Sequence, residues 1–202
     1  MYRVVIALIL MQLVACSALP SNISKSIKLE FSEPNRIQFQ GKGAGAGIAL
    51  MSTMGPVGIA LGVAIDEGIA KDIRKAISEK HDDVQGYLKS QMAGLLTKQG
   101  YLVLLDGEEL KENHFPKMVI KRVGFKITNG STDATAAEWE LELYSGPDTK
   151  TTVNYPKDFA KDTIKTHVLA DLKVNGELGM ELLDESLVKA LNALLIKANS
   201  KL

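Results

Sequence analysis

The residues with the greatest potential for chemistry in this chain are one cysteine and three histidines. Cys16 is the only cysteine, and His81, His114 and His167 lie far apart in the sequence. None of the histidines has the spacing of a zinc motif. His114 lies close to Glu112, which makes these two the nearest approach to an acid–base pair, but a surface histidine is the commoner explanation. We therefore expect no metal site and no histidine-based catalysis.

Other catalytic and nucleotide-binding patterns are also missing from the sequence. No serine lies in a Gly-x-Ser-x-Gly nucleophile elbow. The glycines that begin at Gly41 are not followed by the Gly-Lys-Ser or Gly-Lys-Thr that a phosphate loop requires. Basic and acidic residues number 24 each, with no basic patch, so nucleic acid is not an expected partner. We predict a protein that is not an enzyme and has no cofactor apart from covalent lipid.

The first sixteen residues have the layout of a secretory signal that ends at a cysteine. Arg3 is the one early positive charge, and residues 4–11 form an apolar run. This run is too short to span a bilayer, which takes about 20 residues. The order Leu13-Val14-Ala15-Cys16 resembles the lipobox of bacterial lipoproteins.

That resemblance implies a lipid anchor and a compartment. In lipoproteins the cysteine thiol takes a diacylglycerol, the chain is cut just before the cysteine, and the new amino terminus receives a fatty acid such as palmitate. Two or three acyl chains hold a protein stably at a membrane, whereas one holds it marginally. In Gram-negative lipoproteins an aspartate directly after the cysteine favours retention at the inner membrane. This chain has Ser17 at that position. We therefore expect a lipid-anchored outer-membrane protein that faces the periplasm; an ordinary secreted protein with a chance cysteine is the alternative.

Residues 41–70 form an unusual glycine-rich, apolar segment. Glycine occupies every second position from 41 to 47, and no charged residue occurs from Ala44 to Ile65. Gly55-Pro56 interrupts the segment, because proline suits the first turn of a helix but not its interior. We predict two short helical arms, residues 47–54 and 56–65, joined at Gly55.

Small residues four apart in this segment allow another helix to approach closely, as in membrane helix pairs. Three interpretations remain open. The arms pack on their own domain or on copies of themselves; they form a hairpin that dips into the bilayer; or the first arm is a mobile glycine loop. The segment also resembles the glycine-zipper stretches of small envelope lipoproteins. The candidate interaction or membrane-contact residues are Gly43, Gly47, Gly58, Ala60, Gly62, Ala64 and Gly68.

The remaining sequence predicts an α+β fold: a mostly antiparallel sheet packed against two or more helices, preceded by the glycine-rich apolar helical hairpin. Apolar residues make up 46% and charged residues 24%, which is typical of a globular protein. The predicted organisation is a signal peptide at 1–15, a lipidated tether at 16–26, short strands at 27–40, the glycine-rich segment at 41–70 and the α+β domain at 71–202.

Periodicity places the elements of this domain. A helix over 84–99 ends at Gly100, and the apolar run 101–105 that follows predicts a central strand covered on both faces. The strands expected at 27–31 and 37–39 could pair as a hairpin. An antiparallel hairpin of 118–127 with 138–143 follows, and Glu138, Glu140 and Glu142 should form a solvated row on its second strand. The remaining predicted elements are an edge strand at 151–153, a short helix within 164–174 and a last helix over 178–199.

We therefore expect a lipid-anchored envelope protein that serves as a non-enzymatic scaffold or interaction component. Its expected partners are membrane lipid and either further copies of itself or another envelope protein. The alternative is a periplasmic carrier that binds a lipid or another amphipathic ligand in a groove between sheet and helices. A hydrolase comes third, because catalytic groups can converge from distant positions.

Overall fold

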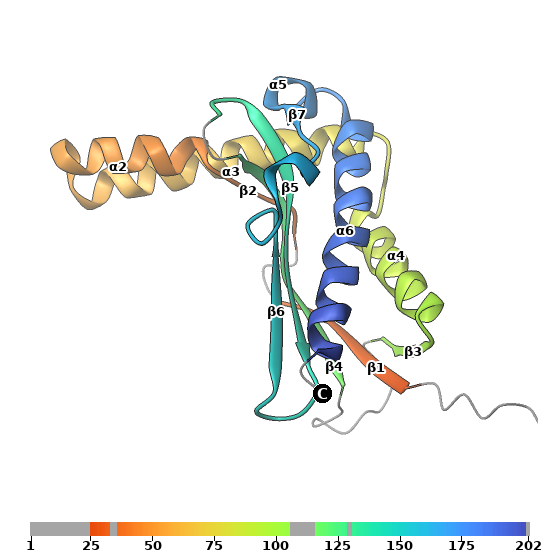
Figure 1. Ribbon diagram of the computed structural model, residues 1–202. Coiled ribbons are helices and arrows are strands. Elements are labelled where there is room, and N and C mark those ends of the chain that lie inside the picture. The colour runs from red at the N-terminus through yellow and green to blue at the C-terminus, as the bar shows by residue number, and fades with distance from the viewer. Residues whose placement is uncertain (1–24, 33–35, 106–115, 129–130, 201–202) are drawn as a thin grey trace, which may run out of the picture.

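The computed structural model describes residues 25–32, 36–105, 116–128 and 131–200. In this part of the chain a mixed seven-stranded sheet carries helices on one face, and a helical hairpin projects on the other side (Figure 1). The α+β class is confirmed. The helices are α2 (Lys42–Met54), α3 (Pro56–Ser78), α4 (Val84–Lys98), the 3-10 turn η1 (Lys161–Thr163), α5 (Leu169–Leu172) and α6 (Gly176–Asn199). The strands are β1 (Lys25–Phe31), β2 (Gln38–Gln40), β3 (Tyr101–Leu104), β4 (Lys117–Ile127), β5 (Ala134–Tyr144), β6 (Lys150–Tyr155) and β7 (His167–Val168).

Several predicted features lie outside the described residues. They are the signal peptide at 1–15, Cys16, the tether up to residue 24, and the pair Glu112 and His114.

The predicted antiparallel hairpin is the centre of the sheet. β4 pairs with β5 along most of its length, from Lys117 opposite Tyr144 to Ile127 opposite Thr135. Because side chains alternate between the faces of a strand, Trp139 shares its face with Val123, its partner on β4. β6 extends this ladder at the sheet edge, as predicted.

The strands that precede the glycine-rich segment do not form a hairpin. β1 and β2 both run parallel to β4, with Lys28 opposite Lys117 and Phe39 opposite Phe125. The chain thus follows one edge of β4 from its beginning to its end. Alternation fixes which face each side chain takes but not the neighbour of a strand, so the sequence pattern fitted both arrangements.

The predicted central strand at 101–105 is wrong in its position. β3 is an edge strand in the order β3-β1-β4-β5-β6 and pairs in parallel with β1. Leu102 is 56% exposed. A short apolar run predicts burial without distinguishing a central strand from an edge strand, because both can be flanked by helices.

The segment between β6 and the last helix contains a short strand in addition to the predicted short helix. His167 and Val168 form β7, a two-residue strand against β5, and α5 follows directly. Asn175 then caps α6 by accepting a hydrogen bond from the Glu177 amide at 3.1 Å.

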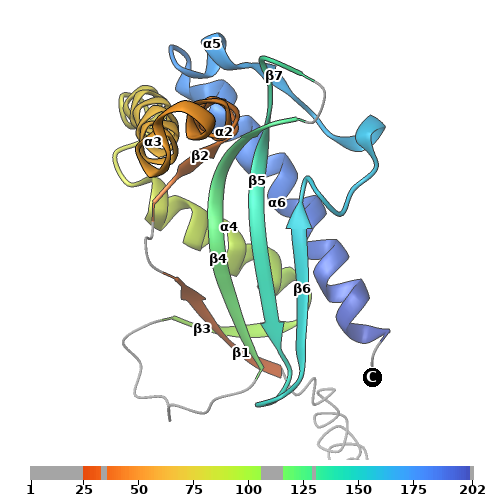
Figure 2. The ribbon, with the colours of Figure 1, turned by 90° about the vertical axis from the view of Figure 1, so that its left-hand side faces the viewer.

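The core lies between the sheet and the helices on its inner face. α6 packs on β5 and β6, and also contacts α3 and α4. It buries a stripe of leucines at helical spacing: Leu183, Leu187, Leu191, Leu194 and Leu195. The indole Nε1 of Trp139 donates to Ser186 Oγ at 2.9 Å, which ties β5 to α6. Figure 2 looks onto the opposite side of the sheet, which we call the outer face, with α4 and α6 behind the strands.

Candidate functional site

The glycine-rich segment forms an antiparallel helical hairpin, and we call residues 42–65 the arm. The two predicted helical arms exist, although the first begins at Lys42 rather than residue 47. Four of the predicted glycines lie between the helices. A Cβ on Gly62 would lie 2.3 Å from the Gly43 carbonyl oxygen, and a Cβ on Gly58 would lie 2.6 Å from the Leu50 carbonyl carbon. These glycines therefore let α2 and α3 pack backbone against backbone within one chain.

The other predicted small residues lie on a different side of α3. Ala60 and Ala64 are exposed, and a Cβ built on Gly68 has no described atom within 4 Å apart from its chain neighbours and the nearby backbone of its own helix. Two positions along a helix correspond to a rotation of about 200°, so this row points away from Gly58 and Gly62. The small residues of α3 thus divide into a packed row and an exposed row.

The tip of the arm is a tight turn at Gly55. Its φ of 57° is in the left-handed region that favours glycine. The Gly55 amide donates to the Met51 carbonyl at 2.9 Å, and Pro56 begins α3, where no amide donor is needed. The hydroxyls of Ser52 and Thr53 donate to the carbonyls of Ala49 and Leu50. The polar side chains near the tip therefore use their donors within the helix.

The base of the arm is held together by charged groups. The Asp66 carboxylate accepts hydrogen bonds from the amides of Gly41 at 3.1 Å and Gly43 at 2.6 Å. A carboxylate is well placed there because the first amides of a helix lack partners and carry partial positive charge. Lys42 also pairs with Asp133 at 2.7 Å, which links the base to the sheet.

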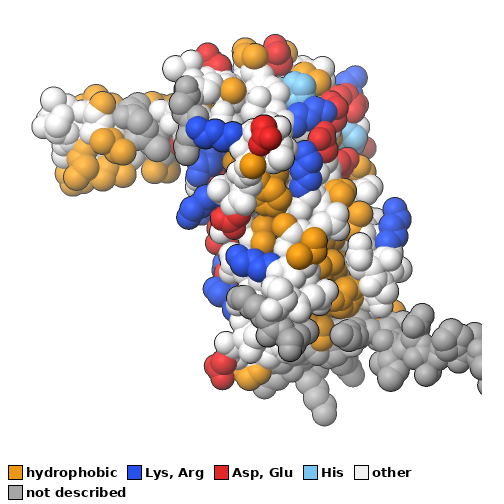
Figure 3. All heavy atoms as spheres, in the orientation of Figure 1, with side chains coloured by type: hydrophobic (Ala, Val, Ile, Leu, Met, Phe, Trp, Pro, Cys, Tyr) orange, Lys and Arg blue, Asp and Glu red, His pale blue; other side chains and the backbone are white. Residues whose placement is uncertain are grey.

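The arm exposes most of its large apolar side chains. Ile48 is 73% exposed and Val63 is 66% exposed. Figure 3 shows hydrophobic side chains along the projecting hairpin, whereas charged side chains gather on the body. A contiguous apolar surface of this kind is rare on a soluble monomer and marks a site of interaction with a protein or a membrane. Exposed with them are Met51, Met54, Val57, Ile59, Leu61 and Ile65.

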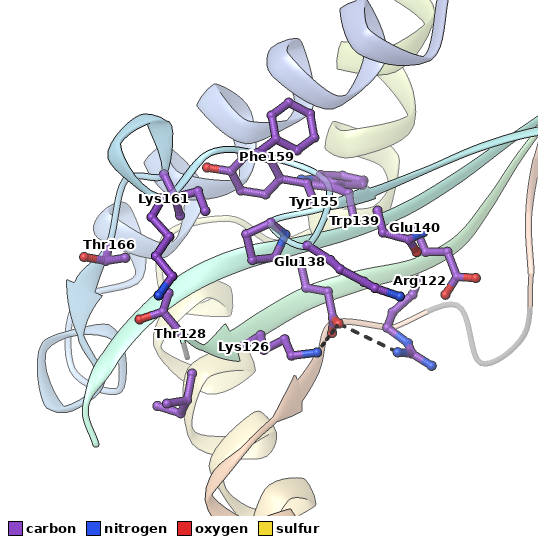
Figure 4. Close-up of a pocket in the computed structure, with 15 residues that line it drawn as sticks. Arg122, Lys126, Thr128, Glu138, Trp139, Glu140, Tyr155, Phe159, Lys161 and Thr166 are labelled. Atoms are coloured by element: carbon purple, nitrogen blue, oxygen red, sulfur yellow. Dashed lines mark ion pairs between the residues drawn. The ribbon is translucent and has the colours of Figure 1, made fainter. Parts of the chain in front are cut away.

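A second feature is a cavity of about 790 Å³ on the outer face. It lies between β4, β5 and β6 and the segment that follows β6, and Figure 4 shows its labelled side chains. No pattern in the sequence predicted this cavity. It is lined by Arg122, Lys126, Ile127, Thr128, Glu138, Trp139, Glu140, Asn154, Tyr155, Pro156, Lys157, Phe159, Lys161, Ile164 and Thr166.

The predicted solvated row of glutamates is partly buried instead. Glu138 is 7% exposed and Glu142 is 6% exposed, while Glu140 is intermediate. Charged residues on alternate strand positions normally indicate a solvent face. Here long neighbouring side chains cover Glu142, and the segment after β6 helps to enclose Glu138 in the cavity. The local alternation of a strand gives no information on such a distant segment.

The two buried glutamates differ in how well their oxygens are satisfied. Glu142 accepts from Lys150 Nζ at 2.8 Å and from the Tyr144 hydroxyl at 2.7 Å. Burial raises the pKa of Glu142, but these two hydrogen bonds outweigh it and the pKa is lowered. Burial raises the pKa of Glu138, and the nearby Lys126 and Arg122 oppose that shift without cancelling it. Glu138 is thus the less compensated carboxylate.

Among the described residues, no group of histidine, cysteine, aspartate and glutamate side chains is placed to hold a metal ion. No helix in the described part of the chain is both long enough and apolar enough to cross a membrane. Comparison with known proteins gives no family: no family model, no curated protein and no solved structure matches this chain.

Proposed function

We propose that this protein is a lipid-anchored scaffold of the cell envelope whose arm docks into one leaflet of a membrane and holds the α+β body against it. The exposed apolar surface of the arm carries this proposal. Full burial of a large apolar side chain contributes about 1.5–3 kcal/mol, and the side chains of the arm, which are 41–73% exposed, each gain roughly the corresponding fraction on insertion. Several of them together outweigh the cost of ordering the hairpin at the surface.

The length of the arm fits one leaflet. The uncharged part of α3, Pro56–Ile65, has ten residues and measures about 15 Å at 1.5 Å per residue. Half of a hydrocarbon core of about 30 Å is the same length. The first charged residues at its base, Lys42 and Asp66, would then lie at the level of the headgroups.

The polar groups of the arm also suit hydrocarbon. A helical hairpin satisfies most backbone donors and acceptors internally, which a bilayer requires. The hydroxyls of Ser52 and Thr53 are bonded within α2, so their donors need no water. Self-association of the arm is the competing explanation for its surface, and the experiment below separates the two. The carrier alternative requires a groove between sheet and helices, where this chain has buried core side chains.

Insertion can be measured with a single thiol at the tip of the arm. If Cys16 is acylated, the mature chain has no free thiol, so Val57→Cys can be labelled specifically with an environment-sensitive dye. Val57 is 56% exposed. In phosphatidylcholine vesicles we expect its emission to shift to the blue and to resist a water-soluble quencher.

The matched control is Val174→Cys, because Val174 is an 80% exposed valine on the body. Its dye should remain accessible to the quencher. Equal quenching at both positions would exclude insertion. Protection of Val57 that appears equally in dilute detergent, together with disulfide-linked dimers of the unlabelled Val57→Cys variant, would indicate self-association instead. Labelling of the unsubstituted protein would show that Cys16 carries no lipid.

A further inference from the structure

We propose that the outer-face cavity binds the headgroup of an anionic, hydroxyl-bearing phospholipid, of which phosphatidylglycerol is the simplest example. This inference rests on the proposed function for the approach to the membrane, although the cavity itself is independent of the arm.

The charge of the cavity favours an anion. Arg122 Nη1 and Lys126 Nζ each lie 3.7 Å from Glu138 Oε1, and Figure 4 shows both converging on this carboxylate. Lys157 and Lys161 make no ion pair with any residue that the structure describes. Four cations therefore line the cavity against two carboxylates. A phosphate diester neutralises part of this excess positive charge through charge-assisted hydrogen bonds.

Glu138 adds a requirement that phosphate alone does not meet. Its side chain is 10% exposed, and its oxygen Oε2 is buried without a donor among the described residues, so the carboxylate must turn about the Cγ–Cδ bond before this oxygen can meet a donor in the cavity. Leaving a buried acceptor without a partner costs about 1–3 kcal/mol. A phosphodiester offers only acceptor oxygens, whereas the hydroxyls of a glycerol headgroup are donors. The cavity thus suits a ligand that has an anionic group and hydroxyls close together.

The position of the cavity favours a lipid over a free phosphate ester. The arm projects on the same side of the sheet as the outer face: Figure 1 shows it opposite α4 and α6, and Figure 2 shows it directed toward the viewer in front of the strands. Insertion of the arm therefore turns the outer face toward the membrane. Lys and Arg side chains gather along that side of the body in Figure 3. Each basic residue near an anionic membrane surface contributes about 1 kcal/mol.

The size of the cavity is suitable. At about 790 Å³ it lies within the range of about 300–1,000 Å³ typical of small-molecule sites. Phe159, Ile164 and Pro156 provide an apolar side on which the carbon atoms of a glycerol can pack. The acyl chains would remain in the leaflet.

The test uses the acylated chain in micelles of a neutral detergent, with soluble dihexanoyl phospholipids as probes. The indole of Trp139 is bonded to Ser186 on the inner face, so binding is measured by isothermal titration calorimetry rather than by tryptophan fluorescence. We expect dihexanoyl phosphatidylglycerol to bind with a Kd below about 1 mM, and the phosphatidylcholine analogue to bind at least about tenfold more weakly. Dihexanoyl phosphatidylmethanol, a phosphodiester of the same charge that lacks the headgroup hydroxyls, should fall between them.

Two variants link binding to the cavity. The double substitution Lys157→Ala/Lys161→Ala should weaken phosphatidylglycerol binding at least about tenfold, or about 1.4 kcal/mol. Both lysines are exposed, so the fold should be retained. The matched control, Lys80→Ala/Lys98→Ala, removes two exposed lysines that do not line the cavity and should bind normally. Glu138→Gln should reduce the preference for phosphatidylglycerol over phosphatidylmethanol.

Three results would overturn the proposal: no binding of any probe, binding that the cavity variants leave unchanged, or glycerol 3-phosphate binding as tightly as the lipid. The last would identify a site for free phosphate esters. Val57→Asp separates this inference from the proposed function, because a charge at the tip opposes insertion but leaves the cavity intact. If the unsubstituted protein binds the probe but its arm does not insert, the cavity site is retained and the membrane-docking function is rejected. If the arm inserts but no probe binds, the docking function is retained and the cavity site is rejected.

Discussion

At the scale of single residues, the glycines of α3 divide into two functional groups. Gly58 and Gly62 lie against the backbone of α2, whereas Gly68 faces open space. The sequence located all of them as small residues at helical spacing. It did not indicate that the close helical partner is the preceding arm of the same chain, because spacing defines a face but not what covers it.

This division predicts opposite effects for the same substitution. Gly68→Ala should stabilise α3 by up to about 1 kcal/mol, because alanine has the higher helix propensity and no atom obstructs its Cβ. Gly62→Ala should destabilise the hairpin by about 1–3 kcal/mol, because its Cβ would lie 2.3 Å from a backbone oxygen that cannot rotate away. Hydrogen exchange of the α2 amides measures both effects. Exchange should accelerate at least about tenfold in Gly62→Ala and not in Gly68→Ala; the same exchange rates in both variants would contradict close packing of the helices.

At the scale of elements, the arm depends on its base as well as on its glycines. The Asp66 carboxylate joins the two helices by accepting from two amides at the start of α2. It is separated from these amides by more than 20 residues, so no local capping pattern reveals it. Asp83, by contrast, caps α4 from the adjacent position and was predictable as a helix start.

Removing these two carboxylates should therefore affect different elements. Asp66→Ala should cost about 1–2 kcal/mol and increase exchange of the α2 amides. Asp83→Ala, which removes the acceptor of the Gly86 amide at 2.8 Å, should cost a similar amount but increase exchange in α4 only. Hydrogen exchange resolved by element distinguishes them. Faster exchange of α2 in both variants would mean that the arm frays with the whole fold rather than at its own base.

The elements also indicate how far sequence reasoning reaches. The long helices, the β4–β5 hairpin and the apolar arms followed from periodicity, because each depends on neighbours within about 30 residues, although the first arm begins at Lys42 rather than residue 47. The parallel pairing of β1 and β2 with β4 joins strands that are about 90 residues apart, and the period of a strand carries no information on such a partner. The cavity depends on the same kind of distant contact, between strands and the segment after β6.

At the scale of the whole molecule, an anchor at Cys16 and an inserted arm, if both are present as proposed, would together constrain how the body lies on a membrane. β1 begins beside the start of β4, and β2 leads into the arm near the end of β4. These two points are separated by about 12 strand residues, or about 40 Å. The nine steps from Cys16 to Lys25 reach about 30 Å at most. A body standing with its strands along the membrane normal, arm end down, would place the tether out of reach of the leaflet.

A body lying with its strands along the membrane satisfies both constraints. The arm runs across the strand direction in Figure 1, so its insertion lays the outer face over the headgroups and keeps the start of β1 near the surface. The cavity then opens toward lipid. Anchor, arm and outer face would act together, and the layer of α4 and α6 would face away from the membrane.

This orientation predicts a difference in distance between two labelled positions and the membrane. Thr166→Cys places a donor dye at the edge of the cavity, and Ile196→Cys places the same dye at a 71% exposed position on α6. Packed layers are separated by about 10 Å, so the first dye should lie at least that much closer to an acceptor dye in the headgroups of phosphatidylcholine vesicles. Energy transfer should be higher from Thr166→Cys. It should become equal for the two positions when Val57→Asp is added, because the body then moves freely on its tether. Higher transfer from Ile196→Cys would mean that the helical layer faces the membrane and that the cavity opens toward water.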